Sequence, residues 1–278
     1  MKLVFQHLPK TGGTSLHEML APHFDRNKIC PERFNDLSDY PSARLAEYEF
    51  YSGHFDRDSI ALIPMNKRII TIFREPGSRI LSLYYFWRSH KEEYYLKNDL
   101  VQPMLANRLS LLEFLKSQHP AITEAIDNSY ARHIIGHSGY ARLLASEASA
   151  EFIADKAIDV ISQFHRYGIM EDMRFTVADI FASLGMPVPL FVRKSNAFGD
   201  FYPHIKRIEK EAVTTEIMAE LTRLSSVDTL IYDFARKSYP ASSRKRRLIL
   251  ILIGIIDTIG SPKLISRYLR NLRNVVFG

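Results

Sequence analysis

A lysine, two glycines and three hydroxyl residues follow the first apolar run of the chain, in the order Lys10, Thr11, Gly12, Gly13, Thr14 and Ser15. The run from Met1 to Phe5 predicts a short strand, which Pro9 ends. The glycines permit backbone angles that other residues avoid, and Thr14 and Ser15 favour the start of a helix. A helix N-terminus beside a lysine binds anions, so this loop predicts a site for phosphate or sulfate.

The order of these residues differs from that of the nucleoside triphosphatase P-loop. In that motif the lysine follows the last glycine and opens the helix, whereas Lys10 precedes both glycines. The next apolar strand pattern, residues 68–73, runs into Arg74 and not into an aspartate that could hold Mg²⁺. The sequence therefore predicts a site that neutralises its anion with Arg, Lys and backbone amides, and it argues against ATP hydrolysis.

A second group of polar residues follows that strand. Pro76 suits the first turn of a helix, which places Arg74 at the carboxyl end of the strand. Ligands of open α/β sheets bind beyond the carboxyl ends of the strands, so Arg74 and Lys10 are expected at one crevice. Arg74 and Ser82 together suit a second phosphate. Arg79 is expected on the same side of the helix as Ser82, either as a ligand contact or in a structural salt bridge.

The two groups together resemble the sulfotransferases that use 3′-phosphoadenosine 5′-phosphosulfate (PAPS), and most of all the carbohydrate branch with the heparan and uronyl 2-O-sulfotransferases. In that family a Pro-Lys-Thr-x-x-Thr-Ser loop binds the 5′-phosphosulfate, which residues 9–15 match. An Arg at a strand end and a Ser eight residues later bind the 3′-phosphate, which Arg74 and Ser82 match. Residues 167–171, 193–196 and 228–232 are similar to looser signatures. The resemblance covers about residues 1–237 and implies PAPS as co-substrate without a metal.

The resemblance also implies roles for three further residues. Sulfuryl transfer to a sugar hydroxyl needs a general base with a pKa near neutrality, which favours histidine. His54, in a predicted strand or strand end at residues 49–55, matches the second His of the family's His-Gly-His, whose first His is Ser52 here. The alternative is a partly buried His54 bonded to a carbonyl. Ser195 and Asn196 are expected to close over the 3′-phosphate or the adenine, the alternative being an ordinary polar loop.

Another pair of histidines has the spacing of a zinc-binding helix. His133 and His137 are four residues apart, but no Glu follows His133 and Gly136 interrupts the pattern. We expect no metal site there.

The chain predicts an α/β fold, namely a P-loop-like three-layer sandwich with a central, mainly parallel sheet, a helical insertion and a helical C-terminal tail. A sulfotransferase domain is expected over residues 1–237, with the insertion at about 91–165, a strand at 166–170, a helix through Leu184 and a helical run over 204–237. The insertion carries ten acidic and seven basic residues. This balance favours a neutral or lightly charged glycan or glycolipid as the acceptor over a densely sulfated one.

The tail, residues 238–278, holds eight Lys or Arg and one acid, although the whole chain carries a net charge of only +6. Its basic cluster at 244–247 precedes an apolar stretch at 248–256, which is shorter than the roughly 20 residues that span a bilayer. A basic amphipathic pattern follows after Pro262. Residues 244–278 therefore predict binding to an anionic membrane surface, the alternative being docking on the body or a second subunit. Without a recognisable module, nucleic acid is not expected as a partner.

The chain begins directly in its first predicted strand, and Cys30 is its single cysteine. Both observations favour a cytoplasmic protein, peripheral at the inner face of the plasma membrane. Two other functions stay open at this point: a nucleotide-dependent kinase on a related fold, and a non-catalytic membrane-associated adaptor that retains the fold. No oligomeric state follows from the sequence.

Overall fold

The computed structural model describes residues 1–189, 192 and 203–239. It contains four strands, β1 (Lys2–Gln6), β2 (Phe50–Gly53), β3 (Lys67–Phe73) and β4 (Arg166–Ile169). The α-helices before β4 are α1 (Gly13–Leu20), α2 (Ser42–Glu47), α3 (Arg57–Leu62), α4 (Pro76–Arg88), α5 (Glu92–Lys97), α6 (Val101–Arg108), α7 (Leu111–Lys116), α8 (Pro120–Ile126), α9 (Ser129–Ile135), α10 (His137–Ala145) and α11 (Ala150–Ile161). Those after β4 are α12 (Met173–Leu184), α13 (Thr215–Leu224) and α14 (Ser226–Ser238), and the turn η4 (Met170–Asp172) joins β4 to α12.

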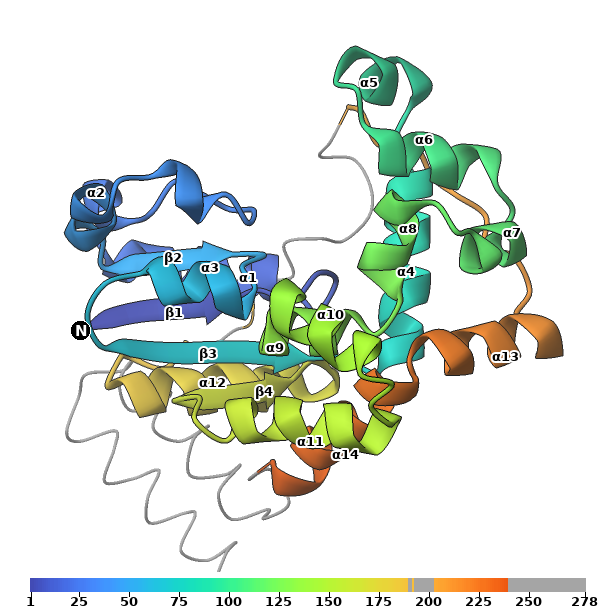
Figure 1. Ribbon diagram of the computed structural model, residues 1–278. Helices are drawn as coiled ribbons and strands as arrows, with labels where there is room; N and C mark the ends of the chain where they lie inside the picture. The colour runs from blue at the N-terminus through green and yellow to red at the C-terminus, as the bar shows by residue number, and fades with distance from the viewer. Residues whose placement is uncertain (190–191, 193–202, 240–278) are drawn as a thin grey trace, which may run out of the picture.

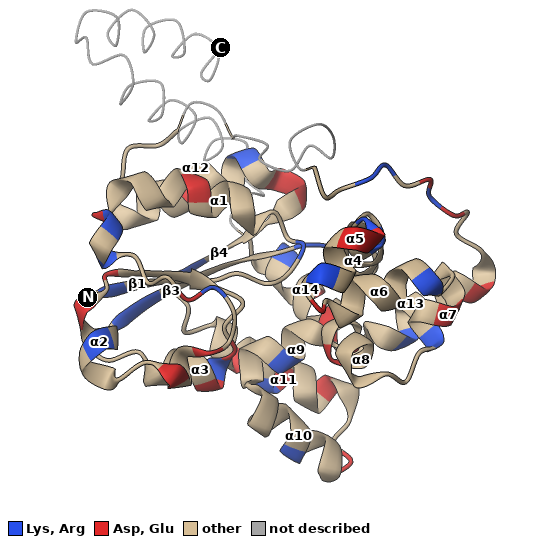
Figure 2. Cartoon of the chain, turned by 90° about the horizontal axis from the view of Figure 1, so that it is seen from above, with Lys and Arg blue, Asp and Glu red and all other residues tan. Residues whose placement is uncertain are grey.

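The strands form one parallel sheet in the order β2-β1-β3-β4. Helices α1 and α12 cover one face of this sheet, and α3, α9 and α11 lie on the other (Figures 1 and 2). Because both faces are covered, all five residues of β1 are buried. The predicted α/β fold with a central parallel sheet between helical layers is confirmed.

Alternate residues of β1 enter different parts of the core. Leu3 and Phe5 belong to the largest apolar cluster, which joins the sheet to α1, α9, α11, α12 and α14, whereas Val4 packs with Tyr51 and α3. A further cluster joins α4 to α6, α7, α8 and α13 and contains no strand residue. The molecule thus has a sheet region and a helical region, and α4 connects them (Figure 1).

The expected insertion is helical but divides between these regions. Helices α5–α8 belong to the helical region, while α9–α11 pack against the sheet. The helix predicted from residue 204 is wrong in its first part, because residues 203–214 form no helix and α13 begins only at Thr215. This segment pairs instead with the end of α4, through an antiparallel bridge between His90 and Ile205. We call residues 203–214 the wall segment.

Ser195, Asn196 and residues 240–278 lie outside the described residues. The predictions for the loop and for the membrane-binding tail therefore stay predictions, as does the division into domains. In the ranges that are described, none of the helices combines the length and apolar character needed to cross a bilayer.

Candidate functional site

The predicted site residues lie at the carboxyl edge of the sheet. His54 comes directly after β2, the loop with Lys10 follows β1, and Arg74 comes directly after β3. Parallel strands end at the same edge, so three segments far apart in the sequence meet there. The three predicted residues thus lie at the ends of three adjacent strands.

The backbone of the loop after β1 is shaped by two residues in the left-handed region. Lys10 has φ 66° and Gly12 has φ 82°. The Thr11 hydroxyl donates a hydrogen bond of 2.8 Å to the carbonyl of Leu8, and Thr11 is fully buried. The side chain of Thr11 therefore closes the loop, which leaves its neighbours to face a ligand.

Helix α1 begins earlier than predicted, because its N-cap is Gly12, which precedes Thr14 by two residues and Ser15 by three. Thr14 and Ser15 lie in the first turn of α1, and backbone amides in the first turn of a helix have no carbonyl partner within the helix, which makes such a turn suited to anions. Gly13 has a further role, since a Cβ there would lie 2.0 Å from Cδ2 of His7. Close packing of His7 against the start of α1 thus requires this glycine.

Arg74 connects β3 to the loop that follows β1. Its Nη1 donates a hydrogen bond of 3.2 Å to the carbonyl of Lys10. The ammonium of Lys10 lies 3.8 Å from the ring centre of Phe86, one turn beyond Ser82 on α4. Burial and then the charge of Arg74 lower the pKa of Lys10 to about 8. Two cations are thus held together in a poorly solvated place, which favours binding of an anion there.

Arg74 and Ser82 line a cleft of about 980 Å³ that runs along α4. Ser78 lines it as well, one turn before Ser82, and Glu75 orients this end of α4 by accepting hydrogen bonds from the amides of Gly77 and Ser78 at 2.8 and 2.6 Å. The opposite side of the cleft is the wall segment, seen in Figure 2 as a coil with charges of both signs that runs toward α13. Of the residues that the structure describes, five cationic side chains and one carboxylate line the cleft, namely Arg74, Lys91, Lys206, Arg207, Lys210 and Glu211.

Several of these cleft residues were missed by the sequence interpretation. Ser78 has the helical spacing to Ser82 that could have revealed it. The basic residues of the wall segment gave no such signal, because their position depends on backbone pairing with distant residues, such as the 2.7 Å hydrogen bond from the amide of Lys206 to the carbonyl of Ser89.

The ring of His54 is hydrogen-bonded to the backbone at the end of β1. Its Nδ1 lies 2.6 Å from the carbonyl oxygen of His7. Since a carbonyl only accepts, Nδ1 carries the proton and Nε2 keeps its lone pair. Burial lowers the pKa of His54 below 6.5, although the hydrogen bond to His7 opposes this shift. His54 is therefore neutral at pH 7. The structure thus shows the alternative arrangement, a partly buried His54 bonded to a carbonyl, and the general base stays a prediction.

Two residues beside His54 were not singled out from the sequence. The carbonyl of Arg33 accepts a hydrogen bond of 2.8 Å from the amide of His54, and its guanidinium lies 2.6 Å from the ring of His17. The next residue, Phe34, is 67% exposed, and its ring centre lies 6.2 Å from that of His54. An exposed aromatic ring and a cation thus adjoin the candidate base.

Arg79 does not share the cleft with Ser82, contrary to expectation. It is fully buried, and its Nη2 donates a hydrogen bond of 3.1 Å to the carbonyl of Ala125. Its guanidinium carbon lies 5.6 Å from the ring centre of Tyr130. Although Arg79 is only three residues from Ser82 on α4, its side chain points into the protein interior. There it contacts Ala125 and Tyr130 and does not line the cleft.

His133 and His137 do not lie on one helix. Helix α9 ends at Ile135, Gly136 has φ 93°, and His137 begins α10. The Nδ1 of His133 bonds to the carbonyl of Ser129 at 2.8 Å. Within the described part of the chain, no cluster of three or more His, Cys, Asp or Glu has the arrangement of a metal site.

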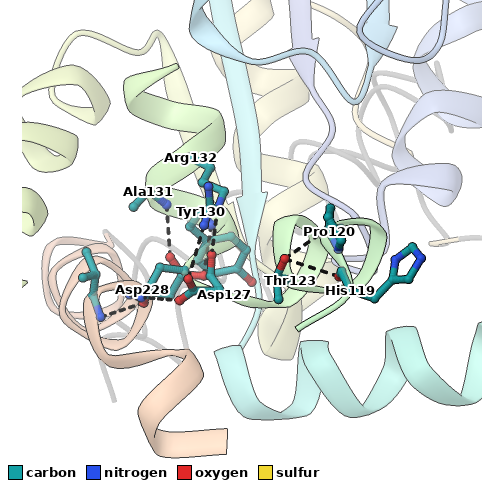
Figure 3. Close-up of polar contacts among 10 residues, drawn as sticks. His119, Pro120, Thr123, Asp127, Tyr130, Ala131, Arg132 and Asp228 are labelled. Carbon is teal, nitrogen blue, oxygen red and sulfur yellow. Dashed lines mark hydrogen bonds and ion pairs between the residues drawn. The ribbon is translucent and has the colours of Figure 1, made fainter. Parts of the chain in front are cut away.

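Two of the looser signatures contain residues that hold the site in place. Glu171 accepts a hydrogen bond of 2.8 Å from the amide of Glu75, directly after Arg74. Asp228 accepts hydrogen bonds of 3.0 Å from the amides of Tyr130 and Ala131 at the start of α9 (Figure 3). These carboxylates stabilise backbone around the cleft and lie behind the residues that line it.

Comparison with known proteins gives no assignment: no family model matches the chain, and no curated protein sequence matches it.

Proposed function

We propose that this protein transfers a sulfuryl group from PAPS to a hydroxyl of a carbohydrate or glycolipid acceptor. The observation that carries the proposal is the junction of Arg74 with the loop after β1, where the guanidinium donates to the Lys10 carbonyl and Ser82 lines the same cleft. In this proposal, Lys10 and Arg74 would each supply a cationic group for one end of a bisphosphorylated nucleotide, at the carboxyl edge of a parallel sheet.

The residues present fit the two anionic groups of PAPS. Lys10 and the amides at the start of α1 suit the 5′-phosphosulfate, and Arg74 with Ser82 suits the 3′-phosphate as a cationic fork plus a hydroxyl. The low-solvent position that depresses the pKa of Lys10 to about 8 also strengthens its attraction for a phosphate. The carboxylate of Glu75 beside Arg74 accepts hydrogen bonds from the amides of Gly77 and Ser78, and among the described residues Glu211 is the carboxylate that lines the cleft.

The reaction needs one proton acceptor and one stabilised leaving group. As the acceptor oxygen bonds to sulfur, its proton moves to Nε2 of His54, while Nδ1 keeps its proton and donates it in the hydrogen bond to the His7 carbonyl. The bond between sulfur and the bridging phosphate oxygen breaks, and the charge that develops on the phosphate is stabilised by Lys10 and the start of α1. Transfer of this loose, in-line kind depends mainly on positioning and charge.

Two residues beside His54 support a sugar as the acceptor. Phe34 offers an exposed aromatic face, and Arg33 offers a half-buried cation. One cation suits a neutral or lightly charged glycan, in agreement with the acidic balance of residues 91–165.

The proposal is tested by measuring conversion of PAPS to 3′-phosphoadenosine 5′-phosphate (PAP) with pooled neutral and uronic-acid oligosaccharides. We expect acceptor-dependent turnover that falls about 10²- to 10⁴-fold in His54→Ala, as removal of a general base predicts, with PAP affinity unchanged. The exposed His23 is the matched control, because it follows α1 in the turn at residues 21–23 and bonds to no site residue. Turnover that survives in His54→Ala contradicts the assigned base, and acceptor-dependent turnover with ATP in place of PAPS contradicts the function.

A further inference from the structure

The side chain of Tyr130 holds both backbone polar groups of Arg74. The amide of Arg74 donates to the Tyr130 hydroxyl at 3.1 Å, and that hydroxyl donates to the Arg74 carbonyl at 2.7 Å. Tyr130 is fully buried, and its ring meets Phe73 edge-on with the ring centres 5.4 Å apart. Tyr130 of α9 lies 56 residues after Arg74 in the chain. It therefore fixes the backbone of Arg74, the residue that is predicted to bind the 3′-phosphate.

This contact takes the place of a strand partner. The ladder between β3 and β4 ends with the pair Phe73 and Ile169, so Arg74 lies one residue beyond it. A buried amide and carbonyl without partners cost free energy, and the Tyr130 hydroxyl serves both. Glu171 then holds the amide of Glu75, and α4 begins at Pro76. Arg74 is thus fixed between the end of a strand and the start of a helix.

Tyr130 is itself fixed by contacts that extend away from the cleft. The carboxylate of Asp228 accepts from the amides of Tyr130 and Ala131 (Figure 3). In return, Oδ1 of Asn128 accepts from the amides of Val227 and Asp228 at 2.9 and 3.3 Å. The starts of α9 and α14 therefore cap each other. This reciprocal capping leaves the Tyr130 hydroxyl little freedom relative to Arg74.

We propose that Tyr130 is a positioning residue for Arg74 and sets the preference of the site for a nucleotide with a 3′-phosphate. This inference rests on the proposed function. A cationic fork recognises phosphate with defined geometry, and supporting residues must hold it to within about 0.5 Å. The Arg74 guanidinium has a single described hydrogen bond, from Nη1 to the carbonyl of Lys10. The position of the Arg74 backbone, and hence of its side chain, therefore depends on the contact with the Tyr130 hydroxyl.

The experiment is calorimetric titration of the full chain with PAP and with 5′-AMP, which lacks the 3′-phosphate. In Tyr130→Phe we expect the affinity for PAP to fall about tenfold, while the affinity for 5′-AMP stays within twofold of wild type. Tyr51→Phe is the matched control, because Tyr51 is also fully buried and its hydroxyl also donates to a backbone carbonyl, that of Leu45 near α2. We expect Tyr51→Phe to bind both nucleotides as wild type does.

Asp228→Asn serves as a second variant, which keeps the Tyr130 ring and hydroxyl but weakens the cap that holds α9. It should weaken PAP binding selectively and by less than Tyr130→Phe. Unchanged PAP affinity in Tyr130→Phe overturns the inference, and so does an equal loss for PAP and 5′-AMP, which a purely structural role predicts. A wild-type protein that binds no PAP refutes the proposed function itself, and the inference with it.

Discussion

Two regions of the molecule, the carboxyl edge of the sheet and the wall segment, differ in how their charged residues are positioned. On the sheet side, Lys10, His54 and Arg74 follow strands whose register is fixed by a hydrogen-bonded ladder. On the helical side, the basic residues of the wall segment lie in irregular backbone and are mostly exposed, and Lys206 contacts the side chain of Asn107. Residues at the strand ends have positions set by the sheet, which suits a ligand of defined shape. The basic residues of the wall segment add positive charge without such fixed positions. We therefore expect the sheet side to provide specificity and the wall segment to provide general attraction.

The sharpest test of this difference compares one arginine from each side. Arg74→Ala should weaken PAP binding at least about 100-fold, because it removes a held, charge-assisted phosphate contact. Arg207→Ala should weaken it no more than about threefold, since an exposed charge acts through screened attraction. Calorimetric titration at two salt concentrations measures both effects. Similar losses in the two variants would show that the sides contribute alike.

The next effect concerns the loop on the sheet side. Gly13→Ala places a Cβ 2.0 Å from the ring of His7, which must move together with the start of α1. We expect a loss of about 1–3 kcal/mol in the free energy of unfolding. Denaturant unfolding measures it, with Gly77→Ala as the control, because a Cβ at Gly77 meets only the flexible side chain of Glu75 at 3.2 Å. Equal stability of the two variants would contradict the tight packing.

The pH dependence of kcat/KM should be bell-shaped, with its two limbs set by the titration of His54 and Lys10. Lys10 must be protonated to bind the phosphosulfate, so activity is present below its pKa of about 8 and lost as the pH rises through it. His54 must be neutral, so activity is lost as the pH falls through its pKa, which burial places below 6.5. In Lys10→Arg the alkaline loss should disappear, because arginine stays charged. An alkaline limb that is unchanged in Lys10→Arg would assign it to another group.

The smallest expected effect is a difference in PAP affinity between variants of two serines, Ser82 on α4 and Ser89 directly after it. Ser82→Ala should weaken PAP binding about three- to tenfold, as loss of one hydrogen bond to a charged group predicts. Ser89→Ala, at the far end of the same cleft, should change it less than twofold, because the Ser89 hydroxyl donates to the carbonyl of Phe86. Titration with PAP compares the two. A larger loss in Ser89→Ala would place the 3′-phosphate at the opposite end of the cleft.

The sequence predicted the strand ends that carry the candidate residues, because those depend on local pattern. Apolar runs ending in a polar residue located the strand ends and hence Lys10, His54 and Arg74, and Pro76 marked the start of α4. These succeed because a strand and the turn after it are specified by neighbouring residues.

The remainder depends on contacts between distant segments. Ile205 and Ile208 have helical spacing, yet the segment pairs with the end of α4 instead, and Ile208 packs on the helical region. Likewise, the position of Arg79 on α4 did not show that its side chain is buried beside Tyr130. Tertiary contacts override periodicity at both places, and a single sequence does not display them.

The measurement that tests the central claim most directly is titration of the wild-type protein with PAP in the presence of EDTA, with ATP plus Mg²⁺ as the comparison. We predict binding of one PAP per chain that needs no metal, because Lys10, Arg74 and the start of α1 supply the positive charge. Binding of ATP only with Mg²⁺, and none of PAP, would contradict the account and favour a nucleotide-dependent kinase.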